Sequence, residues 1–466
     1  MSSVSTKQGA NRRKAIARKL EKLDKKHVWH PFTQMSDWGN EEQTIIESGS
    51  GSVLTDINGN TFIDGVSSLW VNVHGHRKKE IDGAVAAQLK KIAHSTLLGL
   101  SNVPAVLLAE KLIQIAPAGL SRVFYSDNGS TAAEIALKMA FQYWQQKGPE
   151  YRSKTGFISL KEAYHGDTLG SVSVGGIDLF HEVYKPLLFD TYTIDSPHCY
   201  RCALGKSYPD CRMACADQAE EVMGKHCDET AALIMEPLVQ GAAGMLMSPP
   251  GYLRRMRELC TKYHILMIAD EVATGFGRTG TMFACEQEGV TPDIMAVAKG
   301  ITGGYLPLAA TLTTEDLYRG FLGEYRELRT LFHGHTYTGN PLACAAALAS
   351  IDLFKKDKTI ARLQPKIALL SKQLKRFEGL KHVGEVRQKG FMVGVELVRQ
   401  KETKESYPVE DKIGIRVIKE ARNQGLIIRP LGNVIILMPP LSITAAQLKR
   451  LANIAYESIK KVTEDS

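Results

Sequence analysis

The sequence predicts an α/β protein with a mostly parallel sheet in a large domain and a small α+β domain at the C-terminal end. Over residues 120–310, short apolar runs alternate with helical patterns, which is typical of a parallel sheet with helices on both faces. Beyond residue 346 the pattern changes to an amphipathic, lysine-rich helix at 360–378 and short strands. The 466 residues suffice for one large and one small domain.

The composition is that of an ordinary globular protein, with 44% hydrophobic and 23% charged residues. No apolar run reaches the roughly 20 residues of a membrane span, so we expect no membrane contact. Much of the net charge of +8 comes from nine lysines and arginines in residues 7–26, and this charge alone does not indicate nucleic-acid binding. Residues 7–26 contain two acids and six lysines, whereas transit peptides are rich in arginine and poor in acids. We therefore expect these residues to form a solvated basic extension.

The segment after this extension is predicted to join the small domain. It begins with an aromatic stretch at 27–35 that contains a proline break, and we expect this stretch to pack over another surface. Residues 45–73 are predicted to form short strands with a hairpin turn at Asn58-Gly59. The predicted organisation is a basic extension at 1–26, the joining segment at 27–75, the large domain at 76–345 and the small domain at 346–466.

A glycine turn that opens a helix is a candidate phosphate site. Predicted helices at 80–92 and 103–115 precede a strand at Arg122–Ser126. The turn Asp127-Asn-Gly-Ser-Thr131 follows this strand and starts a helical pattern that runs to Trp144. Free N–H groups at a helix start suit a phosphate, but glycine and serine also act simply as turn and cap residues. This motif alone leaves both interpretations open.

Two apolar runs, 265–269 and 294–298, are predicted to be buried parallel strands, and each is followed by one ionisable residue, Asp270 or Lys299. Ligands of such sheets lie beyond the carboxyl ends of the strands, so both side chains should face one crevice. Either residue alone would usually be a cap or a surface charge. Together they are what a pyridoxal phosphate enzyme needs, a lysine that bonds the cofactor aldehyde and an acid that faces the pyridinium nitrogen.

Other strand ends offer further candidates. The strand at Gly156–Leu160 is followed by Tyr164-His-Gly-Asp167, which can place an aromatic ring in the same crevice. Glu236 ends another predicted strand and is either an ion-pair partner within the site or a strand-end charge. Arg278 lies in a Gly-Arg-Thr-Gly loop, where substrate contact and a simple loop charge are equally compatible with the sequence.

Several longer motifs resemble those of the class III (ω-amino) aminotransferases, which have the aspartate-aminotransferase-like fold (PLP fold type I). The resemblance runs from about residue 27 to the end. Its most specific pieces are HVWHPFTQM, DNGSTAAEIALKMAFQYW, AYHGDTLGSVSV, MEPLVQGAAGM, ADEVATGFGRTG, FHGHTYTGNPLACAAA and RPLGNVIILMPP. The first and last pieces are most similar to the subgroup that aminates 8-amino-7-oxononanoate in biotin synthesis.

This resemblance implies a homodimer with shared active sites that transfers an amino group from a small-molecule donor to this keto acid, with pyridoxal 5'-phosphate as cofactor. Separately, the eight cysteines are too sparse for a disulfide scaffold, which predicts a cytoplasmic location. One alternative is another class III enzyme that moves an ω-amine to pyruvate or 2-oxoglutarate. An alternative of a different class is a binding protein or regulator that kept the fold, with its basic extension on nucleic acid or a membrane. Only that extension favours it, so we expect neither partner.

The resemblance also assigns roles to single residues. Catalysis would fall to Lys299, Asp270 and Tyr164. Cofactor binding would use these three with Gly129, Ser130, Val272, His335 and Thr336, the last supplied by the partner subunit. Substrate binding would use Tyr164 and Lys299 with Phe32, Leu69, Trp70, Gly334 and Arg429. Arg429 would grip the substrate carboxylate, although by itself it could equally form a structural ion pair.

Two positions depart from the commonest form of that subgroup, which uses S-adenosylmethionine as amino donor. Phe32 stands in place of a tyrosine, and Leu69 in place of the first of two tryptophans. Loss of a hydroxyl and an indole removes contacts that could hold a bulky sulfonium, so we predict L-lysine as the donor.

Four cysteines form a separate motif with zinc-like spacing. They are Cys199, Cys202, Cys211 and Cys215, in the pattern C-x2-C followed by C-x3-C. Because the class III chemistry needs no metal, the sequence favours free thiols, and no metal centre is predicted.

Overall fold

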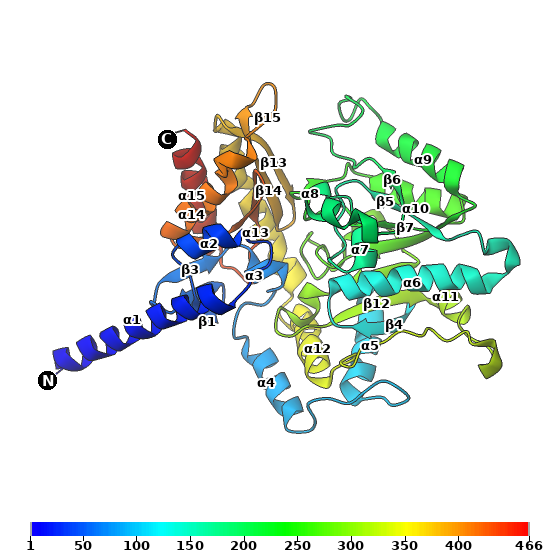
Figure 1. Cartoon of the computed structure of the whole chain (residues 1–466), viewed down its shortest axis with the longest axis horizontal. Helices are drawn as coiled ribbons and strands as arrows, with labels where there is room; N and C mark the ends of the chain where they lie inside the picture. Colours follow the sequence, from blue (N-terminus) through cyan, green and yellow to red (C-terminus); the bar gives the residue numbers. More distant parts are fainter. Residues whose placement is uncertain (1, 465–466) are drawn as a thin grey trace.

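The computed structural model describes residues 2–464 and places a seven-stranded sheet at the centre of the larger of two lobes (Figure 1). The strand order is β4-β12-β11-β10-β7-β5-β6, and β12 alone among these seven runs antiparallel to its neighbours. This mostly parallel sheet confirms the predicted fold class. The strands are β4 (Leu120–Ser126), β5 (Gly156–Leu160), β6 (Tyr192–Ile194), β7 (Thr230–Met235), β10 (Leu266–Asp270), β11 (Ile294–Val297) and β12 (Ala309–Thr314).

Helices cover both faces of this sheet because successive strand residues point to opposite sides. In β10, Ile268 packs in one cluster with α6 (Gly129–Lys147). Met267 and Ala269 belong to a second cluster, on the other face. Burial of both faces explains the continuous apolar runs in the sequence. The second cluster includes side chains from α5 (Val103–Ile115), α9 (Ala214–His226), α10 (Tyr252–Lys262) and α12 (Pro341–Lys356).

The smaller lobe contains two sheets. One has the order β13-β14-β18-β17. In the other, β16 (Leu426–Ile427) pairs with β3, so a C-terminal strand completes the N-terminal sheet β1-β2-β3. The strands of this lobe include β1 (Ile46–Ser50), β2 (Val53–Asp56), β3 (Thr61–Asp64), β13 (Val383–Lys389), β14 (Met392–Gln400), β15 (Glu405–Ser406), β17 (Arg429–Leu431) and β18 (Val434–Leu437). Its helices include α2 (Met35–Asn40), α13 (Thr359–Leu374), α14 (Ile413–Asn423) and α15 (Ala445–Thr463).

The predicted elements of this lobe differ in detail from the observed ones. The hairpin at Asn58-Gly59 is confirmed, since β2 and β3 pair antiparallel around it. The lysine-rich helix predicted at 360–378 leaves α geometry at Leu374 and ends as the 3₁₀ helix η6 (Lys375–Gly379). The predicted strand region 45–73 ends as a strand at Asp64, and the short helix α3 (Ser67–Trp70) follows.

Helix α3 is an irregular turn that positions Trp70. Ser67, Ser68 and Trp70 have φ angles of 53°, 61° and 64°, in the left-handed region that side chains other than glycine rarely adopt. The buried Asp64 carboxylate supports the turn, because it accepts the Ser68 N–H at 2.9 Å and contacts His76 Nε2 at 2.9 Å. Alternation of polar and apolar residues cannot reveal such a backbone, which is why the strand prediction failed there.

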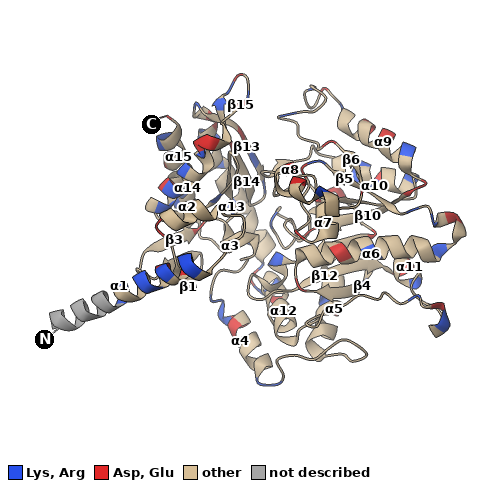
Figure 2. Ribbon diagram, viewed as in Figure 1, with Lys and Arg blue, Asp and Glu red and all other residues tan. Residues whose placement is uncertain are grey.

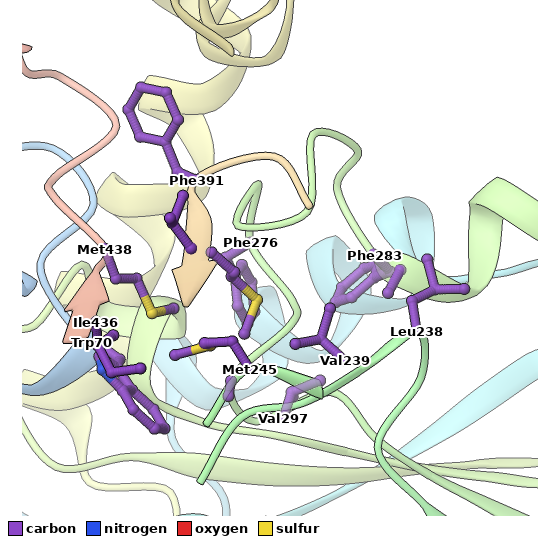
Figure 3. Close-up of a cluster of buried hydrophobic side chains, with 14 of the residues drawn as sticks. Trp70, Leu238, Val239, Met245, Phe276, Phe283, Val297, Phe391, Ile436 and Met438 are labelled. Carbon is purple, nitrogen blue, oxygen red and sulfur yellow. The ribbon is translucent and has the colours of Figure 1, made fainter. Parts of the chain in front are cut away.

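One hydrophobic core runs through both lobes (Figure 3). Val297 of β11 belongs to the large sheet, whereas Ile436 of β18 and Phe391 beside β14 belong to the smaller lobe, and all three are fully buried. The shared core fixes the crevice between the lobes. Figure 3 labels Trp70, Leu238, Val239, Met245, Phe276, Phe283, Val297, Phe391, Ile436 and Met438 of this core.

The N-terminal extension forms the helix α1 (Ser2–His27), which points away from both lobes (Figure 1). Figure 2 shows lysines and arginines along its inner half. Arg13 donates from Nε to the Ile57 carbonyl at 2.8 Å and pairs with Glu47, and Ala17 is buried. From residue 13 onward the extension is mostly exposed, and it is attached to the β1–β2 hairpin. No helix within residues 2–464 is both long and apolar enough to cross a membrane.

Candidate active site

A cavity of about 710 Å³ lies at the carboxyl ends of β10 and β11. Its walls come from the segments that follow β4, β5, β7, β10 and β11, so the crevice is where parallel strands are expected to place it. Seven of the predicted site residues line this one cavity. They are Trp70, Gly129, Ser130, Tyr164, Asp270, Val272 and Lys299.

Lys299 lies two residues beyond β11, as the first residue of the 3₁₀ helix η4 (Lys299–Thr302), with a φ of 45°. Its Nζ is 4.8 Å from the centroid of the Trp70 ring. Burial lowers the pKa of the Lys299 ammonium, whereas Asp270 and Glu236 act in the opposite direction. Because the free amine is the nucleophilic form, this environment favours attack on a carbonyl.

Asp270 is the last residue of β10 and is held by two contacts. Its Oδ2 is 2.7 Å from Nδ1 of His165, and its Oδ1 accepts the Val272 N–H at 3.0 Å. His165 is buried, and its Nε2 has no hydrogen-bond partner among residues 2–464. The carboxylate therefore has a fixed direction. Sequence reasoning missed His165, although it directly follows Tyr164 in the motif that had been singled out.

Glu236 follows β7 and lies within the cavity wall. Its carboxylate accepts the N–H of Tyr164 at 3.2 Å and the N–H of Gly241 at 2.8 Å. Burial is the main cause that raises the pKa of Glu236 to about 7, and Asp270 adds to the rise. Of the two interpretations left open, the ion pair is absent from the described part of the chain, whereas Glu236 does stand at the end of β7, with its carboxyl in the cavity wall.

The start of α6 forms an anion pocket. Asn128 caps the helix by accepting the Thr131 N–H at 3.1 Å. A Cβ on Gly129 would lie 2.6 Å from Val272 Cγ1, and one on Gly166, where φ is 124°, would lie 2.3 Å from Ser130. Only glycine permits these close approaches. Ser130 Oγ is in turn 2.8 Å from Thr168 Oγ1, so three segments converge on the helix N-terminus, where free N–H groups favour a phosphate.

Tyr164 covers the cavity beside these groups. Its hydroxyl donates to Asp167 Oδ2 at 2.8 Å. Burial and this carboxylate raise the pKa of Tyr164, so the phenol stays protonated. With the Lys299 amine, the Asp270 carboxylate and the anion pocket, the side chains supply what pyridoxal phosphate requires. The buried Nε1 of Trp70, which has no partner within the described residues, also leaves a donor for a ligand.

Three predicted residues lie on the loop before α12 and do not line the cavity of their own chain. His335 Nδ1 is 2.7 Å from Asp127 Oδ2, beside the anion pocket. The Thr336 carbonyl accepts from His94 Nε2 at 2.8 Å, while Thr336 and Gly334 are both exposed. This exposure leaves both residues accessible to another subunit.

Three substrate candidates also lie outside the cavity wall. Phe32 is 57% exposed, and its ring centroid is 5.3 Å from that of Phe180, which is 6.4 Å from Tyr164. Leu69 is 49% exposed, next to Trp70. Arg429 on β17 is partly buried, which lowers its pKa, and Tyr164 is the ionisable group beside it. No carboxylate pairs with Arg429 in the described residues, so no structural ion pair accounts for it.

Arg278 has neither of the two roles that the sequence left open. Its side chain is 1% exposed, does not line the cavity, and donates to the carbonyls of Pro439 at 2.8 Å and Asn72 at 2.9 Å. Burial lowers the pKa of its guanidinium to about 10. Arg278 therefore has a structural role, because it joins the backbone at Asn72 to the backbone at Pro439.

Comparison with known proteins places this geometry in context. Residues 35–459 match the family described as aminotransferase class-III. The adenosylmethionine-8-amino-7-oxononanoate aminotransferase of Geobacter sulfurreducens is 55% identical, over 95% of this chain and 98% of that protein. The enzyme of the same name from Aquifex aeolicus is 53% identical, over 96% of this chain and 98% of that protein.

Two solved structures have a similar fold. The crystal structure of the adenosylmethionine-8-amino-7-oxononanoate aminotransferase of Methanocaldococcus jannaschii has a TM-score of 0.91 and 49% identity, over 95% of this chain and 99% of that chain. An amine transaminase from an uncultivated Pseudomonas species, solved in its PLP-bound form, has a TM-score of 0.88 and 37% identity, over 94% of this chain and 98% of that chain.

Proposed function

The chain belongs to the class III aminotransferases, and from this premise we propose that it aminates 8-amino-7-oxononanoate in biotin synthesis, with pyridoxal 5'-phosphate as cofactor. The observation that carries the proposal is the single cavity in which Lys299 and Asp270 meet beside the α6 anion pocket. The relatives that share more than half of its residues carry the name of this activity.

Each side chain of the cavity has a distinct task in this reaction. Bound pyridoxal phosphate supplies an electron sink. Lys299 would hold it covalently, and its Nζ, once free, would carry a proton between the substrate carbon and the cofactor. The Asp270 carboxylate would keep the ring nitrogen protonated, because a nearby anion favours the charged form. Val272 and Tyr164 would pack on the two faces of the ring, and Gly129 and Ser130 would bind its phosphate.

Arg429 would bind the substrate carboxylate. A half-buried guanidinium without a carboxylate partner in the described residues has donors to spare, and Tyr164 places it next to the cavity. The planar fork of arginine suits bidentate contact with a carboxylate. This assignment favours a substrate that carries a carboxylate over a simple amine or ketone.

We further propose L-lysine as the amino donor in place of S-adenosylmethionine. Phe32, whose ring packs against Phe180, offers no hydroxyl, and Leu69, next to Trp70, offers no indole. Aromatic faces attract a sulfonium, so their loss weakens binding of that donor more than binding of lysine. Changes of this kind shift specificity by tenfold or more.

The expected result of a donor assay is diaminononanoate formation with L-lysine at least about tenfold faster, in kcat/KM, than with S-adenosylmethionine. Purified protein loaded with pyridoxal phosphate would be given 8-amino-7-oxononanoate and one donor at a time, with product measured by mass spectrometry. Activity with S-adenosylmethionine and none with lysine would reject the donor proposal. No product with either donor, combined with no rescue of a biotin-requiring strain, would reject the proposed function itself.

We propose a homodimer whose subunits complete each other's sites. Two segments, 89–107 and 328–337, present exposed apolar side chains. They are joined by a hydrogen bond of 2.8 Å between His94 Nε2 and the Thr336 carbonyl. Thr336 itself is exposed at this surface, where it could reach a partner's phosphate pocket. Exposed apolar side chains gathered on such segments favour association. These side chains are Leu89, Ile92, Leu98, Leu100, Val103, Val106, Leu107, Leu328, Phe332 and Tyr337.

Replacing Leu98 and Leu100 by aspartate should convert the dimer to a monomer and abolish most activity. Burial of unpaired carboxylates costs several kcal/mol, so the dimer dissociation constant should rise by about 100-fold or more. Size-exclusion chromatography with light scattering measures the mass. Val409→Asp is the control, because Val409 is 85% exposed on the 3₁₀ helix η7 (Val409–Asp411), away from this surface. A fully active monomer would contradict the shared-site proposal.

We also propose a cytoplasmic location. All eight cysteines of the sequence are free thiols in the structure, which fits a reducing compartment.

A further inference from the structure

The loop between β6 and α9 is long and lacks regular secondary structure from residue 195 to 213. Loops of this length inside a compact protein are uncommon and usually have a function. None of its residues lines the catalytic cavity. It carries three of the four cysteines of the C-x2-C and C-x3-C motif, and the fourth, Cys215, is the second residue of α9. The catalytic chemistry uses none of these thiols.

The fold brings these four thiols to one place. Cys199, Cys202, Cys211 and Cys215 all line a single small cavity of about 20 Å³. Two short turns fix the loop around it, because the Cys202 carbonyl accepts the Gly205 N–H at 3.0 Å and Cys211 donates its N–H to Ser207 at 2.8 Å. None of the four forms a disulfide.

We propose that Cys199, Cys202, Cys211 and Cys215 bind one zinc ion as a tetrathiolate site. Four sulfurs from two short-spaced pairs are the ligand set of structural zinc sites. Each thiol would release its proton to solvent as its sulfur bonds the ion. In the described residues no three of these sulfurs lie within 4.8 Å of one another, so zinc would draw them to the roughly 3.8 Å of a tetrahedron with 2.3 Å bonds.

A second polar cluster nearby is not the metal site. His198, Glu385 and Glu396 have ligand atoms within 4.8 Å of one another. However, Arg387 pairs with both carboxylates, and Arg201 Nε lies 2.6 Å from Glu396 Oε1. Because these arginines already neutralise both carboxylates, a metal ion would bind there only weakly.

The contacts around Glu396 indicate that the zinc would hold this loop against the smaller lobe. Arg201 lies between Cys199 and Cys202 and binds Glu396 on β14 of the smaller lobe, while Lys404 donates to the Tyr200 carbonyl at 2.6 Å. Arg387 extends this contact by donating to the Gly244 carbonyl at 2.8 Å. A zinc ion that fixes the C-x2-C turn would thus hold the loop against the smaller lobe. The site is structural and lies apart from the reacting groups.

The test is metal analysis of the full-length holoenzyme, expressed without a histidine tag and with zinc in the medium. We expect about one zinc per chain. The double variant Cys202→Ser/Cys211→Ser should contain at most about a tenth of the zinc of the wild type. The control Cys227→Ser changes a partly exposed thiol outside the loop and should contain as much zinc as the wild type. Cobalt in place of zinc should give visible bands of tetrahedral thiolate coordination at wavelengths where the cofactor does not absorb.

A second measurement on the unaltered protein covers the case in which the double variant does not fold. Titration with a mercurial thiol reagent should release the zinc as the loop thiols react. Wild-type protein with less than about a tenth of a zinc per chain, or zinc that stays bound after these thiols are blocked, would overturn the proposal. Iron with inorganic sulfide in place of zinc would also overturn it, in favour of a cluster.

Discussion

Replacement of Lys299 by alanine should reduce kcat by about 10⁴-fold or more, because one side chain supplies both the covalent attachment and the proton transfer. Its amine is buried in the cavity, and burial lowers its pKa, so no other group of the wall can replace it at neutral pH. Product formation from 8-amino-7-oxononanoate measures the loss. Borohydride treatment followed by peptide mass spectrometry should label Lys299 in the wild type and give no label in the variant.

The control for this variant is Lys372→Ala, which removes an exposed lysine of α13 and should leave activity unchanged. A small primary amine added to Lys299→Ala should restore part of the proton transfer, which separates a chemical defect from a folding defect. Retention of more than a tenth of the activity, or a borohydride label on a different lysine, would show that the assignment of Lys299 is wrong.

Replacement of Asp270 by asparagine should reduce kcat/KM by about 10³-fold. The change keeps the shape and a hydrogen-bond acceptor for His165 but removes the charge that faces the ring nitrogen. A pair of opposite charges about 4 Å apart is worth about 4 kcal/mol at an effective dielectric constant of 20, which corresponds to this factor. The pH titration of the cofactor absorbance should show a lower pKa of the ring nitrogen in the variant.

Glu271→Gln is the matched control, since Glu271 is the neighbouring buried carboxyl and does not line the cavity. Burial raises the pKa of Glu271, so its glutamine variant resembles the neutral form and should change kcat/KM by less than about threefold. Equal losses in both variants would point to a general effect of buried carboxyl groups and would refute the role of Asp270.

The sequence predicted those parts of the site that local patterns determine. Apolar runs that end at Asp270 and before Lys299 identify strand ends, and parallel strands bring their carboxyl ends together whatever else the chain does. The glycine turn at Gly129 was ambiguous alone, and the close approach of Val272 now explains why glycine is required there. Such predictions need only periodicity and strand order.

The parts that the sequence did not predict depend on contacts between distant segments. His165 and Asp270 are 105 positions apart, and no spacing rule links a histidine in a turn to an acid on another strand. Arg278 binds the carbonyls of Asn72 and Pro439, which only the folded chain brings together. The Glu236 carboxylate is held in the cavity wall by the N–H groups of Tyr164 and Gly241, and the contact with Tyr164 spans 72 positions.

The hydrophobic core shared by the two lobes limits how this enzyme can move (Figure 3). A hinge rotation that parted the lobes would bring Phe391, Ile436 and Met438 into water, at about 1.5–3 kcal/mol for each side chain. The open state is therefore rarely populated at thermal energies. Substrates must then enter and leave by movement of loops and side chains around the opening of the active-site cavity. Discrimination among amines then depends on the shape of that entrance instead of on domain closure.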